Sequence, residues 1–285
     1  MTAGTIIFSV LISLGSRLMM WNDQLLLRIN SVAGRSWLFD NIVAFFRDND
    51  LAKAGVIGGC FLAAWFVGKS NDKGINVRRK ILITTLIAAV CVITTTKILS
   101  HTIFLPRPEI QSQKIYRLEG DQLVEMKRVP VRIPLDETSQ KDYHALLNGD
   151  IETSDLGSFP SDHAGFFIAI SLGIWLASRR LGWLALGWTV LVILGGKMIG
   201  AHHTPLDIAA GAAVAVVELA IIQYVVRRGF SGWLDKLTGL TIRYSALSSA
   251  LVFLVAFEVS STMIHIRAFF GLLAAMRRHV LLGMG

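Results

Sequence analysis

The sequence carries little charge for its length. Of its 285 residues only 17% are Asp, Glu, Lys or Arg, whereas 53% are hydrophobic. A soluble domain carries about 25% charged residues, so the composition excludes an ordinary soluble protein. Uncharged segments recur instead, each a little short of the roughly 20 residues that span a bilayer as a helix. They are residues 54–68, 81–96, 164–178, 181–196, 208–217 with 219–226, and 244–257.

Cysteine is scarce as well, and so are the common cofactor motifs. Cys60 and Cys91 both lie in the middle of apolar segments, so neither suggests a disulfide or a metal site. No dense carboxylate cluster indicates a metal ion and no Walker-type loop indicates a nucleotide, so we expect no cofactor.

Residues 1–20 lack the basic start of a secretory signal. They form either a first span or an interfacial helix.

The net charge of +8 would suit a nucleic-acid-binding protein, but its distribution does not. Lys and Arg gather in three connections between apolar segments, at residues 68–80, 179–180 and 227–236. Short loops rich in Lys and Arg stay on the cytoplasmic side of a membrane. We therefore expect no nucleic-acid partner, with residues 100–159 and the turn at 200–205 facing outward.

This pattern predicts an all-α polytopic membrane protein. Residues 1–50 would form the N-terminal apolar segment and interfacial amphipathic helices, residues 51–226 the transmembrane core, and residues 227–285 an extra C-terminal span with an amphipathic tail. Within the core, residues 109–158 are too polar to be embedded and predict a small extramembrane cap. Gly120-Asp121 lies between two β-prone stretches, which indicates a hairpin. A short helix should end near Gly149.

Three polar clusters fall at the outward ends of the predicted spans: KILSHTIFLPRPE, FPSDHAG and GGKMIGAHHTPLD. The candidate site residues in them are Lys97 and Arg107, then Ser161, Asp162 and His163, then Lys197, His203 and Asp207. The predicted topology puts all three clusters on one face of the membrane. A helical bundle is therefore able to bring them together.

These residue types suit the chemistry of a phosphate ester. The three cations match a dianionic phosphate, and Ser161 precedes a helical run whose first N–H groups would bind an anion. His203 is able to attack phosphorus as a nucleophile. Asp207 would then hold the far nitrogen of that imidazole, and His163 would protonate the departing oxygen.

Each residue also has a purely structural interpretation. Ser161 and Asp207 suit helix N-termini, and the three cations suit the snorkelling side chains that anchor spans. His202 is interpreted as a neighbour of His203 and not as a second nucleophile. The joint occurrence of three clusters on one membrane face favours the functional interpretation.

The clusters resemble the signature of the type 2 phosphatidic acid phosphatase family, the membrane lipid phosphate phosphatases related to vanadium haloperoxidases. The family pattern is K-x6-R-P, then P-S-G-H, then S-R-x5-H-x3-D, and the resemblance covers roughly residues 51–226. It implies a six-helix transmembrane core, no required metal, a phosphohistidine on His203 oriented by Asp207, and His163 as the acid. The phosphate-binding residues would be Lys97, Arg107, Ser161, Asp162 and Lys197.

Each of the three motifs departs from the family pattern. Lys97 lies three residues before the family lysine, whose place Ser100 takes. Because helix positions three apart share a face, Lys97 is able to reach the same phosphate from one turn deeper. Asp162 stands where glycine is usual, and Gly196-Lys197 replace Ser-Arg.

The P-S-D-H form is similar to that of bacterial undecaprenyl pyrophosphate phosphatases. It implies a multi-pass protein of the bacterial inner membrane that hydrolyses this lipid at a site facing the periplasm or exterior. Phosphatidic acid, phosphatidylglycerol phosphate and lipid A phosphates stay open as substrates. A lipid-to-lipid phosphotransferase would use the same residues, and a non-enzymatic transporter or scaffold would use the cations to bind an anion.

Overall fold

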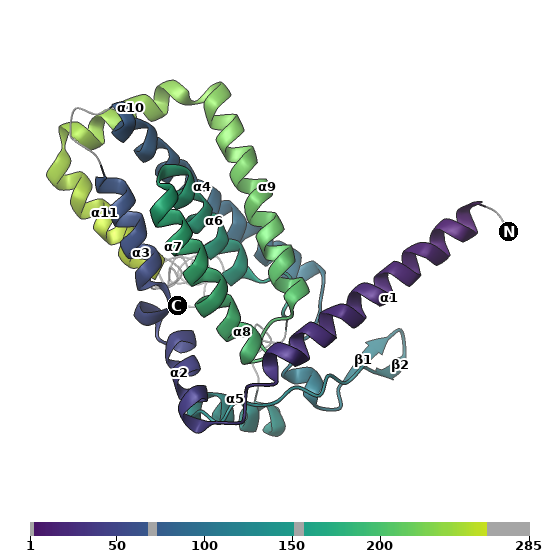
Figure 1. Cartoon of the computed structure of the whole chain (residues 1–285). Coiled ribbons are helices and arrows are strands. Elements are labelled where there is room, and N and C mark those ends of the chain that lie inside the picture. Colours follow the sequence, from purple (N-terminus) through teal and green to yellow (C-terminus); the bar gives the residue numbers. More distant parts are fainter. Residues whose placement is uncertain (1–2, 68–72, 151–156, 261–285) are drawn as a thin grey trace, which may run out of the picture. The chain divides into compact units, whose positions relative to one another are not determined.

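The computed structural model describes residues 3–67, 73–150 and 157–260, and most of these residues are helical (Figure 1). The first helices are α1 (Ala3–Asn30), α2 (Trp37–Asp48), α3 (Asp50–Phe66), α4 (Lys73–Thr102) and α5 (Glu137–Asn148). The later ones are α6 (Asp162–Ala177), α7 (Arg179–Trp188), α8 (Gly195–Ile199), α9 (Pro205–Gly229), α10 (Ser231–Arg243) and α11 (Ser245–Ser260). A 3-10 turn, η1 (Ile110–Ser112), follows α4, and a π-helical segment, η3 (Thr189–Leu194), joins α7 to α8.

Three of the described helical segments are long and apolar enough to cross a membrane, which supports the prediction of a helical membrane protein. They are Gly74–Thr102, Arg179–Ile199 and Pro205–Gly229. The pair α10 and α11, bent by 108°, makes up to one further span, and α6 is a shorter apolar helix. The six-helix core stays a prediction. Residues 68–72 of the first basic connection and the expected amphipathic tail after residue 260 lie outside the described residues.

The two predicted elements of the cap are both present. Strands β1 (Tyr116–Glu119) and β2 (Gln122–Glu125) pair antiparallel around Gly120, whose φ of +62° suits a tight hairpin turn. Helix α5 begins where the Asp136 carboxylate accepts a hydrogen bond from the Ser139 backbone N–H. It ends at Gly149, which adopts the left-handed conformation with a φ of +80°.

The internal contacts of the chain define two compact units. The first combines residues 1–45, 90–166 and 194–217, and the second combines residues 46–89, 167–193 and those from 218 on. Helices α4, α6 and α9 contribute residues to both units. All three polar clusters belong to the first unit. The division of the chain at residues 50 and 226 stays a prediction.

Two buried polar side chains hold residues 132–135 of the first unit in place. The Asn30 amide accepts a hydrogen bond from the backbone N–H of Arg132 at 2.6 Å and donates to the carbonyls of Arg132 and Ile199. The Asp40 carboxylate accepts from the backbone N–H groups of Gly34 and Leu135. Buried polar groups need partners, so these bonds fix the segment 132–135 against the end of α1 and the end of α8.

Candidate active site

Two glycines allow three helices to meet where the polar clusters converge. A Cβ atom on Gly211 of α9 would lie 2.2 Å from the carbonyl oxygen of Ser161, and one on Gly165 of α6 would lie 2.7 Å from Cγ1 of Val92 on α4. Both distances are too short for a real Cβ contact. Small residues permit such close helix packing in membrane proteins. They bring the start of α6 against α4 and the start of α9.

The start of α6 is fixed by Ser161. Its fully buried side chain accepts a hydrogen bond from the backbone N–H of Ala164 at 3.3 Å, so the expected N-cap is confirmed. Its own backbone N–H donates to the carbonyl of Asp207 at 3.1 Å. The first N–H groups of a helix carry partial positive charge and attract anions. The role of Ser161 in phosphate binding stays a prediction.

The start of α9 is fixed by a reciprocal pair of hydrogen bonds. The Asp207 carboxylate accepts from the backbone N–H of Thr204 at 2.6 Å, and the Thr204 hydroxyl accepts from the backbone N–H of Asp207 at 3.2 Å. This is a capping box, and Pro205 occupies the first helical position. The structural interpretation of Asp207 as a helix cap is therefore confirmed. The capped turn directly follows His203.

His203 lies on the connection between α8 and α9 and is 6% exposed. Its Nδ1 atom lies 3.0 Å from the carbonyl oxygen of Ser158. Because a carbonyl only accepts, Nδ1 carries the hydrogen of the neutral ring and Nε2 keeps a lone pair. The sequence assigned this orienting role to Asp207. The structure shows the Ser158 carbonyl as a partner of Nδ1, and the orienting role of Asp207 stays a prediction.

The surroundings of His203 keep its imidazole neutral. Burial lowers the pKa of His203 well below its usual value. The nearby positive charges of His163, Lys197 and Arg107 lower this pKa further, against the opposing effect of Asp162. A neutral imidazole with a lone pair on Nε2 is the form that a nitrogen nucleophile requires.

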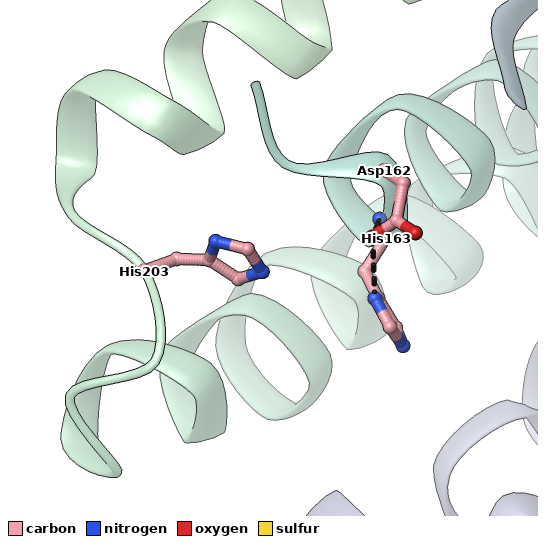
Figure 2. Close-up of side chains that lie close together, drawn as sticks. All are labelled: Asp162, His163 and His203. Carbon is pink, nitrogen blue, oxygen red and sulfur yellow. Dashed lines mark hydrogen bonds and ion pairs between the residues drawn. The ribbon is translucent and has the colours of Figure 1, made fainter. Parts of the chain in front are cut away.

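Asp162 connects two other predicted site residues. Its Oδ1 accepts a hydrogen bond from the backbone N–H of His163 at 2.8 Å and lies 2.9 Å from Nδ1 of the same residue. Its Oδ2 lies 3.1 Å from the Lys97 ammonium. Figure 2 shows Asp162 and His163 at the start of α6, with the His203 ring extending toward them. Lys97 therefore contacts the same group of side chains as His163, from a position about one helical turn before Ser100 on α4.

The same group of side chains includes possible metal ligands. Among the described residues, Asp162, His163 and His203 form one cluster whose ligand atoms all lie within 4.8 Å of one another. The surrounding charges oppose a bound cation, because Lys97 already pairs with Asp162 while Lys197 and Arg107 act on His203. The arrangement suits an anion better than a metal ion.

Glu109 is a site residue that the sequence analysis missed. Its Oε1 lies 3.6 Å from the Arg107 guanidinium and its Oε2 lies 3.0 Å from Nδ1 of His202. Burial would raise the pKa of Glu109, but His202, Arg107 and Lys197 hold it below its usual value. The available signal was an acid directly after the R-P pair. His202 is therefore a partner of Glu109 as well as a neighbour of His203.

A cavity opens beside this ion-paired group. It has a volume of ≈ 300 Å³ and is lined by Arg107, Glu109 and His202 on one side and by α5 residues such as Tyr143 and Leu146 on the other. All of these residues belong to the first unit. The predicted cap also contacts the turn that carries His203, because the backbone N–H of Glu109 donates to the carbonyl of Ala201 at 3.0 Å.

Comparison with known families covers the part of the chain that holds these clusters. The model of the PAP2 superfamily matches residues 79–230, more than half of the chain. The chain belongs to the PAP2 superfamily. All the candidate site residues of this PAP2 protein, from Lys97 to Asp207, lie inside the matched range.

The chain resembles a curated protein over part of its length. The relative is the bacitracin transport permease protein BcrC of Bacillus licheniformis, which is 37% identical over 78 residues. The match covers 27% of this chain and 37% of that protein. No solved structure gives a significant match.

Two departures of this PAP2 chain from the family pattern touch each other in the structure. Ser100, at the place of the family lysine, donates its hydroxyl hydrogen to the backbone carbonyl of Lys97 at 2.9 Å. The Lys97 ammonium contacts Asp162, which stands at the place of the family glycine. The displaced lysine and the added carboxylate therefore form one pair.

Proposed function

We propose that this chain is an integral membrane lipid phosphatase that works through a phosphohistidine on His203. The observation that carries the proposal is the state of His203, which is buried, neutral and bonded through Nδ1 to the Ser158 carbonyl. Its ring extends toward His163 at the start of α6. Membership of the PAP2 superfamily supports the same chemistry.

In the first step, Nε2 of His203 attacks the phosphorus atom of the lipid phosphate. The bond from phosphorus to the lipid oxygen, or to the bridging oxygen of a pyrophosphate, breaks. Protonated His163 gives its proton to that oxygen. The N–H groups at the start of α6 and the cations Arg107 and Lys197 would stabilise the negative charge of the transferring group.

In the second step, water releases the phosphate. Neutral His163 takes a proton from water while the water oxygen attacks phosphorus, and the bond from phosphorus to Nε2 breaks. Inorganic phosphate leaves. His203 returns to its neutral form and His163 is protonated again, so the cycle needs no cofactor.

We further propose undecaprenyl pyrophosphate as the substrate, hydrolysed on the outer face of a bacterial inner membrane. The P-S-D-H form, similar to that of undecaprenyl pyrophosphate phosphatases, supports the substrate. The clustering of Lys and Arg in the other set of connections supports the outward orientation. The lipid and the bilayer are then the partners of the chain.

Rapid quench of the purified protein with lipid substrates tests the proposal. Wild-type protein should accumulate acid-labile phosphate on His203, mapped by mass spectrometry, and release inorganic phosphate. His203→Ala should abolish both signals. His163→Ala should lower turnover of a lipid monophosphate by about 10²–10⁴-fold, the usual worth of general acid catalysis.

Four other results would contradict parts of the proposal. Phosphate on His202, or an active His203→Ala variant, would overturn the nucleophile. Phosphate appearing on a second lipid instead of in solution would indicate a phosphotransferase. No release from any lipid phosphate or pyrophosphate would favour an anion-binding transporter or scaffold.

A further inference from the structure

Asp162 places a negative charge where a phosphate group is expected to bind. We propose that Asp162 is a positioning residue, which holds His163 with its Nε2–H directed at the departing oxygen, and that Lys97 neutralises the carboxylate. This inference rests on the proposed function. It assigns to the Asp162 side chain a task other than phosphate binding, which its backbone N–H at the helix start would still perform.

The geometry gives each carboxylate oxygen of Asp162 a different partner. Oδ1 lies 2.9 Å from Nδ1 of His163, and Oδ2 lies 3.1 Å from Nζ of Lys97. An ionised carboxylate only accepts hydrogen bonds, so Nδ1 of His163 must carry a hydrogen. The proton to be transferred is therefore held on Nε2. A carboxylate facing an imidazole also stabilises its protonated form, which is the form that a general acid requires.

The backbone at the start of α6 limits how far this pair can move. Oδ1 also accepts from the backbone N–H of His163 at 2.8 Å, and α6 itself is tied to α9 through Ser161 and Asp207. The carboxylate is thus fixed relative to the helix start. The imidazole of His163 is fixed relative to the carboxylate.

The ammonium group of Lys97 balances the negative charge of the Asp162 carboxylate. A carboxylate beside a dianionic phosphate would repel it, and a paired ammonium removes most of that repulsion. The Lys97 side chain is 53% exposed and that of Asp162 is 26% exposed. An ion pair this exposed contributes little to stability. Charge balance in the site is therefore a better account of the pair than a stabilising role.

The pair also explains why two departures from the family pattern occur together. A glycine at position 162 brings no charge, so a lysine at position 100 is available to the phosphate alone. With Asp162 in that place, the lysine is found three residues earlier, about one helical turn deeper on α4. There its ammonium meets the carboxylate.

The first test compares Asp162→Asn with wild type on two substrates that differ in leaving group. One is a lipid alkyl phosphate, whose alkoxide must be protonated as it leaves, and the other is 4-nitrophenyl phosphate, which needs little help. The variant should lose about 10–100-fold in kcat/KM on the alkyl phosphate, part of the worth of the general acid, and less than about 3-fold on the nitrophenyl ester. The ratio kcat/KM is compared because it covers the steps up to departure of the leaving group and not the later hydrolysis of the phosphoenzyme. Equal losses on both would overturn the inference, because a structural defect slows both substrates alike.

The second test examines the pairing with Lys97. If Lys97 serves Asp162, the loss caused by Lys97→Met should shrink when Asp162→Gly is also present, since contacting residues are not additive. Adding Ser100→Lys to that double variant restores the family arrangement and should recover kcat/KM relative to Asp162→Gly alone. Additive losses with no recovery would overturn the pairing. Melting temperature and phosphoenzyme yield with 4-nitrophenyl phosphate check that each variant is folded.

Failure of this inference and failure of the proposed function give different results in these assays. Wild-type protein that releases no phosphate from either substrate or from a lipid pyrophosphate would remove the proposed function and the inference with it. Active wild-type protein with leaving-group-independent losses in Asp162→Asn and Asp162→Gly would remove the role of Asp162 alone.

Discussion

At the residue scale, the histidine chemistry depends on backbone groups that no motif records. The pattern H-x3-D identified His203 and Asp207, and the structure places both at the start of α9. The hydrogen-bond partner of Nδ1, however, is the carbonyl of Ser158, 45 residues away in sequence. Any residue type offers a carbonyl, so the sequence carried no signal for it. The contact of Asp162 with His163 was also invisible, because adjacent residues face each other only in particular rotamers.

The depressed pKa of His203 predicts the acid side of the activity profile. Since the nucleophile must be neutral, kcat/KM should fall on acidification only below the ordinary histidine pKa of about 6.5. Lys197 contributes to this by repelling the imidazolium, alongside burial, His163 and Arg107 and against Asp162. Lys197→Gln should therefore move the acid limb of kcat/KM to higher pH, whatever it does to the maximum rate. The pH dependence of phosphate release measures this.

Lys197→Arg is the matched control, because it keeps the charge and should leave the acid limb in place. An unmoved acid limb in Lys197→Gln would show that this charge does not act on the nucleophile.

The lowered pKa of His203 also makes the stability of the fold depend on pH. A lowered pKa in the folded state means that the neutral imidazole of His203 stabilises the fold fully above the unfolded value of about 6.5, and this contribution is lost as the pH falls toward the folded pKa.

At the element scale, the sequence predicted where the helices lie better than it predicted which helices pack against each other. Apolar segments and capping residues located α5, α6 and α9, and the hairpin around Gly120 followed from its flanking β-prone residues. Which helices meet is decided by glycines such as Gly165 and Gly211, whose importance depends on the atoms opposite them. A glycine in an apolar run looks the same in sequence whether it faces a backbone carbonyl or open space.

Gly211 supplies a prediction for this helix contact. In Gly211→Ala the new methyl group would meet the Ser161 carbonyl at 2.2 Å, so the start of α6 must move away from α9. Displacement of catalytic groups by about 1 Å costs about 10²-fold, and kcat should fall by that order. Phosphate release by the variant, at matched protein recovery, measures the loss.

The control for this substitution is Gly59→Ala in α3. A Cβ there has nothing within 4 Å, and alanine favours helix over glycine, so activity should be unchanged and the melting temperature equal or higher. A fully active Gly211→Ala variant would show that the two helix starts need not approach so closely.

At the scale of the whole molecule, the amino-acid composition indicated the class of protein but not the arrangement of its helices. The shortage of charge correctly indicated a helical membrane protein, since three described helical segments suit a bilayer. The number of core helices was expected from family resemblance, and length alone does not decide it: α6 is short, and α10 and α11 are bent by 108°. Likewise, each unit combines separate stretches of the chain, because helices such as α4 and α9 contribute residues to both units. No boundary in the sequence marks that division.

Membrane orientation is the last prediction and belongs to this scale. The Lys and Arg bias places the connection at Arg179 and Arg180 in the cytoplasm and the cap outside. In a variant whose two cysteines are replaced by alanine, a single cysteine at Asp121 should react with an impermeant maleimide in intact cells. A cysteine at Ser178 should react only after permeabilisation. The hairpin turn at Asp121 and the connection at Ser178 lie in different units of the chain, so each variant reports independently. Labelling of Ser178→Cys in intact cells would place the site containing His203 on the cytoplasmic side and exclude an external lipid pyrophosphate as its substrate.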